Sequence, residues 1–410
     1  MPNDPASADL LALSRPPAVR LGPWGSAVLP LLGGLERGRL TLVDPFGAVR
    51  VFDGRRPGPQ ATVRIADAAA LHRLVTGGSV GFAEAYMDGL WDSPGLTALI
   101  ELAAVNTDLD DRLEGRWTTR AMNRVLHLLR GNTKRGSRRN IAYHYDLGNG
   151  FYRRWLDPTM TYSAAVFETP DQDLTAAQVA KYERLAALLH VGPGNRVLEI
   201  GCGWGGFARH LATTRGCHVT GITLSTEQLT WAQEMAQREG LADRLEFRLQ
   251  DYRDVPETYD AVASIEMFEA VGEEHWPVYF RTLHDRLKPG GHGALQVITI
   301  AEDRFDRYRR GADFIQRYIF PGGMLPSPSR MRQGLADAGL SLTHEAEYGS
   351  HYAETLRRWQ QDFQREWPAI RASEGFDERF HRMWTYYLAY CEAGFRAGTI
   401  DVVHFGLTRP

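Results

Sequence analysis

The stretch VLEIGCGWGGF, residues 197–207, is the strongest structural signal in this 410-residue chain. An apolar run carrying one acid, Glu199, leads into Gly201, Gly203, Gly205 and Gly206, and a helical pattern follows. Such an order is typical of a buried strand, a tight turn and a helix. Glycines let the backbone turn sharply and approach a ligand closely. The stretch therefore predicts a ligand site between a strand and a helix.

The sequence around this stretch alternates strand-like and helical segments. The other strand-like runs are HVTGIT (218–223), LEFRLQD (245–251), YDAVASI (259–265) and GALQVITI (293–300). The alternation predicts an α/β fold with a doubly wound, mainly parallel, Rossmann-like sheet. In such sheets ligands bind beyond the carboxyl ends of the strands.

The first part of the chain has a different pattern. Residues 1–129 mix short strand-like and helical pieces and predict a smaller α+β domain. The segment RGNTKRGSRRN (130–140) is basic, rich in glycine and serine, and predicts a linker that is either solvated or in contact with anionic lipid headgroups. The main α/β domain then spans 141–410.

Composition narrows the class of protein. With 43% hydrophobic and 24% charged residues the chain resembles ordinary soluble proteins, and a net charge of −3 argues against a general nucleic-acid binder. Cys202, Cys217 and Cys391 lack the spacing of a disulfide framework or a metal site. The N-terminus is unlike a signal peptide, and no apolar run reaches the length of a membrane span. We therefore expect a cytoplasmic protein without metal, with at most peripheral membrane contact.

The glycine spacing fits two kinds of cofactor. GxGxxG also occurs in dinucleotide sites, but the strand at 218–223 ends without the acid that binds the ribose of NAD. Glu199 can reach the amino acid end of S-adenosylmethionine (SAM), and Asp251 can accept from its adenine amino group. We therefore favour SAM. Gln228 either binds the ribose or only caps a helix with Ser225, and Trp204 either lines the cofactor or packs the helix.

A second stretch with a possible function is SIEMFEAVGEEHW (264–276), which carries two carboxylates close together. Glu266 and Glu269 lie three residues apart at a strand-to-helix corner that needs only one of them structurally. Glu266 ends the strand 259–265, so its side chain should project into the ligand crevice. The alternative is that Glu266 only stabilises the N-terminus of the following helix.

Several stretches together resemble the cyclopropane fatty acid synthase family, from about residue 140 to the C-terminus. These are YHYDLGNGFYRRWLDPTMTYS (143–163), VLEIGCGWGG (197–206), GITLSTEQ (221–228), QDYRD (250–254), MFEAVG (267–272), YIFPGGMLPS (318–327) and MWTYYLAYCEAGFRAG (383–398). The resemblance implies methyl transfer from SAM to a cis double bond of an unsaturated phospholipid in the bilayer, by an enzyme bound peripherally to the inner face of the membrane. With the reasoning above, the predicted cofactor site comprises Tyr162, Ser163, Glu199, Gly201, Gly203, Trp204, Gly205, Thr223, Gln228, Asp251 and Tyr252.

The resemblance also implies a departure at the catalytic base. Typical members hold a bicarbonate with a cysteine, a glutamate, a histidine and a tyrosine. Here Ala164 and Gln296 replace the cysteine and the histidine, while Glu269 and Tyr352 remain. Glu266 stands where the typical pattern has glycine. We hypothesise that Glu266 supplies the carboxylate in place of bicarbonate, that Gln296 hydrogen-bonds it, and that Glu269 orients it or shares its proton.

A changed base affects the product. After methyl transfer, loss of a proton from the new methyl group closes a cyclopropane ring, whereas loss from a neighbouring carbon gives a methyl-branched or methylene-bearing chain. SIEMFEAVG with Gln296 resembles the branch that includes unsaturated fatty acid methyltransferases, so we favour methylation without ring closure. The alternatives are ring closure, a SAM methyltransferase of a soluble small molecule, an NAD-dependent oxidoreductase and an inactive lipid-binding relative.

Two further expectations concern aromatic and basic residues. Aromatic rings can stabilise a carbocation, and Tyr352 matches an active-site tyrosine of the family. The other C-terminal candidates, most of them explained by core packing, are Tyr318, Trp384, Tyr386, Tyr387 and Tyr390.

The segment 304–326 interleaves arginines with aromatics and predicts either an interfacial helix or a helix with one wet and one buried face. We expect the N-terminal domain to assist lipid docking or to form a homodimer.

Overall fold

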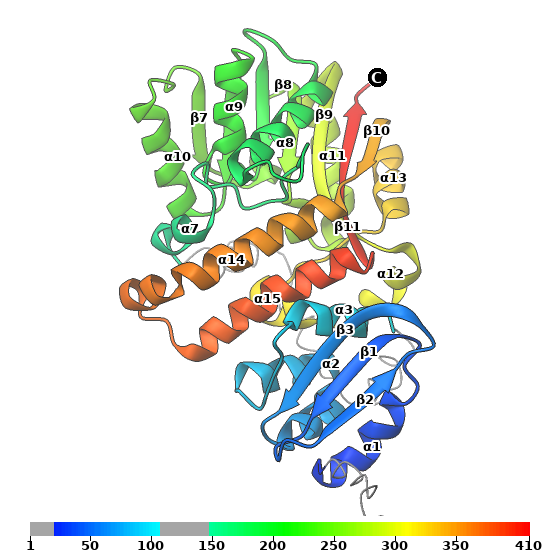
Figure 1. The fold of residues 1–410 in the computed structure, drawn as a ribbon. Coiled ribbons are helices and arrows are strands. Elements are labelled where there is room, and N and C mark those ends of the chain that lie inside the picture. Colours follow the sequence, from blue (N-terminus) through cyan, green and yellow to red (C-terminus); the bar gives the residue numbers. More distant parts are fainter. Residues whose placement is uncertain (1–19, 107–146) are drawn as a thin grey trace, which may run out of the picture. The chain divides into compact units, whose positions relative to one another are not determined.

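The computed structural model describes residues 20–106 and 147–410 (Figure 1). The chain divides into two compact units, residues 1–115 and 116–410. The predicted domain end at 129 and the basic linker 130–140 lie outside the described residues, so both remain predictions.

The N-terminal unit is a small α+β fold, as predicted. Its four-stranded sheet has the order β2-β1-β3-β4, in which β1 and β3 are parallel and the other pairs antiparallel. At the β1–β2 turn the carboxylate of Asp44 accepts hydrogen bonds from the backbone N–H groups of Phe46 and Ala48, which fixes the tight connection. The elements are α1 (Gly22–Leu32), β1 (Arg37–Val43), β2 (Val49–Asp53), β3 (Arg56–Ile65), α2 (Ala69–Met87), β4 (Trp91–Asp92) and α3 (Leu96–Ala104).

The C-terminal unit contains a seven-stranded sheet of order β10-β11-β9-β8-β5-β6-β7. The five strands β5 to β9 are parallel, which confirms the predicted doubly wound sheet, while β10 and β11 add an antiparallel edge that was not predicted. The strands are β5 (Arg196–Ile200), β6 (His218–Thr223), β7 (Leu245–Leu249), β8 (Tyr259–Ile265), β9 (Leu287–Ile300), β10 (Ser341–Glu347) and β11 (Ile400–Thr408).

Helices cover both faces of this sheet and bury an apolar cluster on each. One cluster joins α8, α9 and α10 to the strands, and the other joins α11 and α13 to the opposite face. The two long helices α14 and α15 pair with each other beside the sheet (Figure 1). The helices are α7 (Asn149–Trp155), α8 (Leu174–Leu189), α9 (Gly206–Thr214), α10 (Thr226–Arg238), α11 (Trp276–Arg286), α12 (Glu302–Tyr308), α13 (Pro328–Asp337), α14 (Gly349–Glu374) and α15 (Glu378–Arg396).

The arginine- and aromatic-rich segment 304–326 does not form one interfacial helix. It contains the end of α12 and a short π-helix, Ile315–Ile319. Phe305, Phe314 and Ile319 are at most 3% exposed, because they pack into the protein. The prediction of one interfacial helix is therefore wrong, and so is the alternative of one helix with a wet and a buried face. Contact of this segment with lipid stays a prediction. Within the described ranges, no helix is both long enough and apolar enough to cross a bilayer.

Candidate active site

The glycine turn after β5 forms an open cradle. Gly201, Gly203 and Gly205 have φ angles of 81°, 52° and 89°, in the left-handed region that favours glycine. A side chain at Gly203 would meet nothing within 4 Å, so the backbone there is open to a ligand. Trp204 is buried, and its indole N–H donates to the side-chain oxygen of Asn149 at 2.6 Å, which ties the turn to α7.

Glu199 offers this cradle an unsatisfied carboxylate. Its Oε2 atom is buried and has no hydrogen-bond partner. Burial raises the pKa of Glu199 to about 8, which the charge of Lys181 partly offsets. A buried acceptor without a partner is costly unless a ligand supplies a donor. The cradle and this carboxylate therefore fit the ammonium group of the methionine part of SAM.

The next strand end is organised around Thr223. The Ser225 hydroxyl accepts from the backbone N–H of Gln228 at 3.3 Å and caps α10, which is the Ser225 half of the predicted capping box. The Gln228 side chain does not complete a capping box, because its Oε1 accepts from the Thr223 hydroxyl at 2.8 Å. The side chain is thus held beside the strand end, and its role towards a ribose remains a prediction.

The carboxylate of Asp251 has a partner within the protein that the sequence did not suggest. Arg253 donates to both of its carboxylate oxygens, at 2.8 and 2.6 Å, and this ion pair was not predicted. The Tyr252 ring packs edge-on against Tyr279 at 5.5 Å between centroids. Any adenine amino group would share Asp251 with Arg253.

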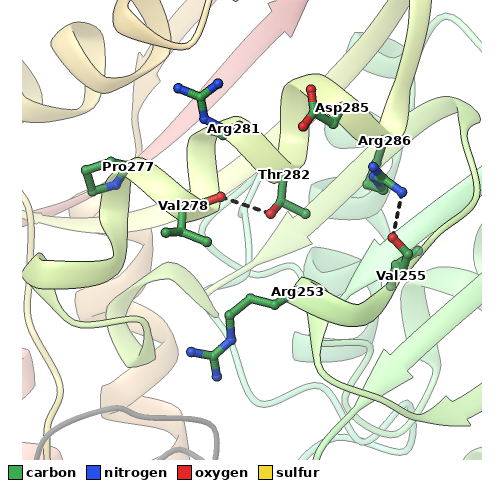
Figure 2. Close-up of a pocket in the computed structure, with 8 residues that line it drawn as sticks. All are labelled: Arg253, Val255, Pro277, Val278, Arg281, Thr282, Asp285 and Arg286. Atoms are coloured by element: carbon green, nitrogen blue, oxygen red, sulfur yellow. Dashed lines mark hydrogen bonds between the residues drawn. The ribbon is translucent and has the colours of Figure 1, made fainter.

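Arg253 also borders a shallow pocket of about 260 Å³ against α11 (Figure 2). The Arg286 guanidinium donates to the carbonyl of Val255 at 2.6 Å, and the Thr282 hydroxyl donates to that of Val278 at 2.9 Å. The side chains of Arg286 and Thr282 are thus engaged within the protein. The remaining lining residues are Pro277, Arg281 and Asp285.

The Glu266 carboxylate is held at three points. Its Oε1 accepts from the backbone N–H of Ala164 at 2.8 Å and from Nε2 of Gln296 at 2.6 Å. Its Oε2 accepts from the Tyr352 hydroxyl at 2.6 Å. The residue follows β8 directly and has φ of 48°, a conformation that an L-residue rarely adopts. Both oxygens are engaged inside the site, so the alternative of a helix-capping role is not supported.

Glu269 lies in the same site, but its carboxyl group contacts a different part of the backbone from that of Glu266. Its Oε1 accepts from the backbone N–H of Ile298, and its Oε2 is buried without a partner. Desolvation and the nearby charge of Glu266 raise the pKa of Glu269 to about 8. Desolvation also raises the pKa of Glu266, but its three hydrogen bonds and Lys181 oppose that shift. Among the described contacts no hydrogen bond joins the two carboxyl groups, so they act on each other through charge.

His404, which the sequence did not single out, fixes the orientation of Gln296. The two residues are partners across β9 and β11, and Nε2 of His404 lies 2.8 Å from Oε1 of Gln296. Burial lowers the pKa of His404 to about 3, so the ring is neutral and donates through Nε2. The amide NH₂ of Gln296 is thereby directed to Glu266.

Lys181 is a second residue that was missed. It is fully buried on α8, and its ammonium group donates to the Ser163 hydroxyl oxygen at 2.7 Å. Gln178 donates to the Ser163 carbonyl at 2.9 Å. A lysine four residues after the buried Ala177 and four before the buried Leu185 occupies the apolar face of the helix, a signal that could have been noticed.

The aromatic candidates separate into two groups. The Tyr352 hydroxyl contacts Glu266, and the Tyr387 hydroxyl lies 2.7 Å from that of Tyr162. The others pack against neighbouring rings: Tyr318, Tyr386 and Tyr390 around Phe314, and Trp384 on Phe151 and nearby rings.

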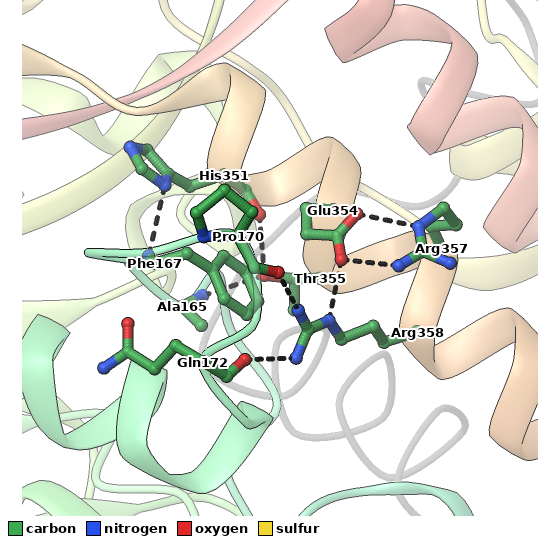
Figure 3. A network of polar contacts seen from close by, with 9 residues as sticks. All are labelled: Ala165, Phe167, Pro170, Gln172, His351, Glu354, Thr355, Arg357 and Arg358. Carbon is green, nitrogen blue, oxygen red and sulfur yellow. Dashed lines mark hydrogen bonds and ion pairs between the residues drawn. The ribbon is translucent and has the colours of Figure 1, made fainter.

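Helix α14 clamps the segment that carries Ala164 (Figure 3). Thr355 accepts from the backbone N–H of Ala165 at 3.1 Å, and Nδ1 of His351 accepts from that of Phe167 at 3.1 Å. The Arg358 guanidinium lies 4.4 Å from the centroid of the Phe167 ring. It also donates to the carbonyls of Gln172 and Pro170 and to the Glu354 carboxylate, which Arg357 binds as well. The clamp holds the Ala164 N–H in place for Glu266.

The sequence matches a known protein family over most of the C-terminal unit. The sequence profile of the family described as mycolic acid cyclopropane synthetase matches residues 132–405. The chain belongs to this family. It is a SAM-dependent methyltransferase of the cyclopropane fatty acid synthase type.

Individual relatives cover most of the chain. Tuberculostearic acid methyltransferase UfaA1 from Mycobacterium tuberculosis is 41% identical over 374 residues, covering 86% of this chain and 83% of that protein. Cyclopropane-fatty-acyl-phospholipid synthase from Escherichia coli K12 is 35% identical over 342 residues, covering 83% and 86%. The structure of mycolic acid cyclopropane synthase CmaA1 complexed with SAH and CTAB has a TM-score of 0.62 at 32% identity, covering 66% of this chain and 97% of that one.

Proposed function

We propose that the enzyme methylates the cis double bond of an unsaturated phospholipid acyl chain and leaves a methyl-branched or methylene-bearing chain that keeps an alkene. The observation that carries this proposal is the Glu266 carboxylate, held by Ala164, Gln296 and Tyr352. The resemblance implies a bicarbonate pocket at these residues, and two of its usual ligands are replaced here by Ala164 and Gln296. Glu266 takes the role of the base.

The cofactor residues have separate tasks in this proposal. The glycine turn lets the backbone approach SAM, Glu199 accepts from its ammonium group, and Trp204 lines the site. Thr223 and Gln228 lie at the ribose side, and Asp251 and Tyr252 at the adenine side. When bound, SAM would supply an electrophilic methyl group. The π electrons of the alkene would form the new carbon–carbon bond as the sulfur–methyl bond breaks, so that S-adenosylhomocysteine leaves and the other alkene carbon becomes a carbocation.

Glu266 completes the reaction by removing a proton. A chain carbon next to the cation loses its proton to a Glu266 oxygen, and the electrons of that C–H bond form the new double bond. A methylene-bearing chain requires a 1,2-hydride shift first, which moves the cation to the methyl-bearing carbon, so that the methyl group then loses the proton. The Tyr352 ring can stabilise the cation through its negative face. With its raised pKa, Glu269 stays protonated at neutral pH and adds no second negative charge beside Glu266. Tyr352 and Gln296 hold the base fixed throughout.

The product preference rests on the relatives and on the base. The 41% identical relative is called a methyltransferase, and the 35% identical one a cyclopropane synthase. A carboxylate on a protein side chain can be aimed at a different carbon from a bound bicarbonate. Both observations favour methylation without ring closure.

Mass spectrometry of fatty acids tests this proposal. The enzyme is incubated with SAM and unsaturated phospholipid vesicles, and the product is hydrogenated mildly. A chain that gains one carbon and then takes up hydrogen to give a methyl-branched saturated chain supports the proposal. A product that gains one carbon but resists hydrogenation shows ring closure. Methylation of soluble acceptors but not of vesicle lipid would support the small-molecule alternative.

We also infer that the β1–β2 hairpin of the N-terminal unit contacts the bilayer. Phe46 at the turn is 77% exposed, and Val49 and Val51 on the edge strand are each 48% exposed. Residues 37–65 carry six arginines and two aspartates, a balance that suits anionic headgroups. We expect Phe46→Ser to weaken cosedimentation with anionic vesicles several-fold without changing SAH binding. Unchanged cosedimentation would place the contact elsewhere.

A further inference from the structure

The pocket against α11 is lined by three arginines and one acid (Figure 2). Arg253, Arg281 and Arg286 border its volume of about 260 Å³, and Asp285 is the one acidic residue among its described lining. The lining therefore has an excess of positive charge. A recess lined by one sign of charge attracts ligands of the opposite sign. None of these four side chains takes part in the reaction described above.

Two of these arginines have donors that the protein does not use. Arg281 is exposed, and no described residue forms a hydrogen bond or an ion pair with it. Nη1 of Arg286 donates to the carbonyl of Val255, but its Nε atom is buried without a partner. Buried donors without an acceptor are rare and costly. The uncompensated Nε–H adds to the positive potential of the pocket.

Arg253 connects the pocket with the cofactor site. Its Nε and Nη2 atoms donate to the two carboxylate oxygens of Asp251, at 2.8 and 2.6 Å. A guanidinium group has five N–H donors, and no described hydrogen bond uses those on Nη1 of Arg253. Arg253 can therefore hold Asp251 with one edge and bind an anion in the pocket with its other donors.

The floor of the pocket indicates the chemical class of the anion. In Figure 2, Val278 and Thr282 lie between Arg281 and Arg253. Val278 is 45% exposed, and the Thr282 hydroxyl is bound to the Val278 carbonyl, so the floor is largely apolar. Arginine forks bind phosphoryl oxygens well, and a phosphoryl group has enough oxygens for two arginines. The carbon part of a phosphate ester can then pack on Val278.

We propose that this pocket binds the phosphoryl group of a phosphate ester between Arg253 and Arg281. A phospholipid headgroup and a soluble phosphate ester share this chemistry, and the experiment below distinguishes them. The bound phosphoryl group competes with Asp251 for the Arg253 guanidinium and so leaves Asp251 more available to the adenine amino group. This link rests on the cofactor assignment within the proposed function, whereas the phosphoryl site itself does not.

Phosphorus NMR of inorganic phosphate with the full-length protein, at constant ionic strength, tests the site. Arg281→Met should weaken phosphate binding about tenfold, as expected for the loss of a charge-assisted hydrogen bond. Asp285→Asn should strengthen it about twofold, because a nearby negative charge is removed. Arg238→Met removes the same charge as Arg281→Met from an exposed position on α10 and should change nothing. A wild type that binds no phosphate, or equal losses in both arginine variants, would overturn the site.

Two further measurements identify the source of the phosphoryl group and test the link. Cosedimentation with phosphatidylglycerol vesicles that falls several-fold in Arg281→Met would identify a lipid headgroup, and unchanged cosedimentation a soluble ester. Calorimetry with S-adenosylhomocysteine (SAH) should show about twofold tighter binding to the wild type in saturating phosphate, with no such gain in Arg281→Met. Unchanged or weaker SAH binding would overturn the link to Asp251. Failure of the wild type to bind SAH at all would instead overturn the cofactor assignment.

Discussion

Replacing Glu266 with glutamine should strongly reduce turnover and spare the fold. The glutamine oxygen can still accept from the Ala164 N–H and from Gln296, and the new NH₂ can donate to the Tyr352 oxygen, whose hydroxyl also acts as an acceptor. All three contacts can therefore form in the variant, and in the contact with Tyr352 the donor and the acceptor are exchanged. What is lost is the negative charge and the basic oxygen.

The magnitude follows from that loss. A positioned general base contributes about 10²- to 10⁴-fold, so turnover should fall roughly 10³-fold, about 4 kcal/mol in activation free energy. SAH affinity should stay within twofold, because Glu266 is not assigned to the cofactor. The variant also no longer buries an acid whose pKa is raised by desolvation, so its melting temperature should not fall.

The assay is transfer of a labelled methyl group from SAM to unsaturated phospholipid vesicles. Glu273→Gln is the matched control, since Glu273 belongs to the same segment but binds Arg309 at the surface, and it should retain turnover. Turnover of Glu266→Gln within fivefold of the wild type would refute the role of Glu266 as base. A parallel loss of SAH binding would show a structural role instead.

Two other predictions concern the groups around this carboxylate. His404→Phe should lower kcat about tenfold with SAH affinity unchanged, because Gln296 loses the donor that orients its amide. His404→Gln should restore part of the lost kcat. Equal kcat in the wild type and both variants would contradict the role of His404 in orienting Gln296. Glu269 has a pKa of about 8 in the folded state against an ordinary value of 4.5, so its contribution to stability declines as pH rises between these values. Glu269→Gln should therefore gain melting temperature over the wild type at pH 8 and not at pH 5, and a pH-independent difference would argue against the shift.

Much of the central sheet could be predicted because parallel strands are buried on both faces. The runs 218–223 and 259–265 match β6 and β8 residue for residue; β8 is rich in apolar residues, and β6 is buried at five of its six positions. Strand β10 is half-exposed along its length and carries no such pattern. The antiparallel edge therefore had no clear signal in the sequence.

The active site was predictable where it depended on neighbouring parallel strands. Glu266 and Gln296 meet because β8 and β9 are paired, with Ile265 opposite Gln296. The contact of Gln296 with His404 depends on the register of β9 with β11, 108 residues apart along the chain, which no local pattern reveals. The Arg253 pairing with Asp251 is likewise a matter of side-chain conformation.

The most direct measurement is the bicarbonate dependence of turnover in carbon dioxide-free buffer, for the wild type and for Glu266→Gly. Glycine suits the φ of 48° at this position and leaves room for a small carboxylate between Ala164, Gln296 and Tyr352. If Glu266 is the base, the wild type turns over equally with and without bicarbonate, while the glycine variant is inactive and recovers saturably when bicarbonate or formate is added. A wild type that requires bicarbonate, or a glycine variant that is active without any added carboxylate, would contradict the account.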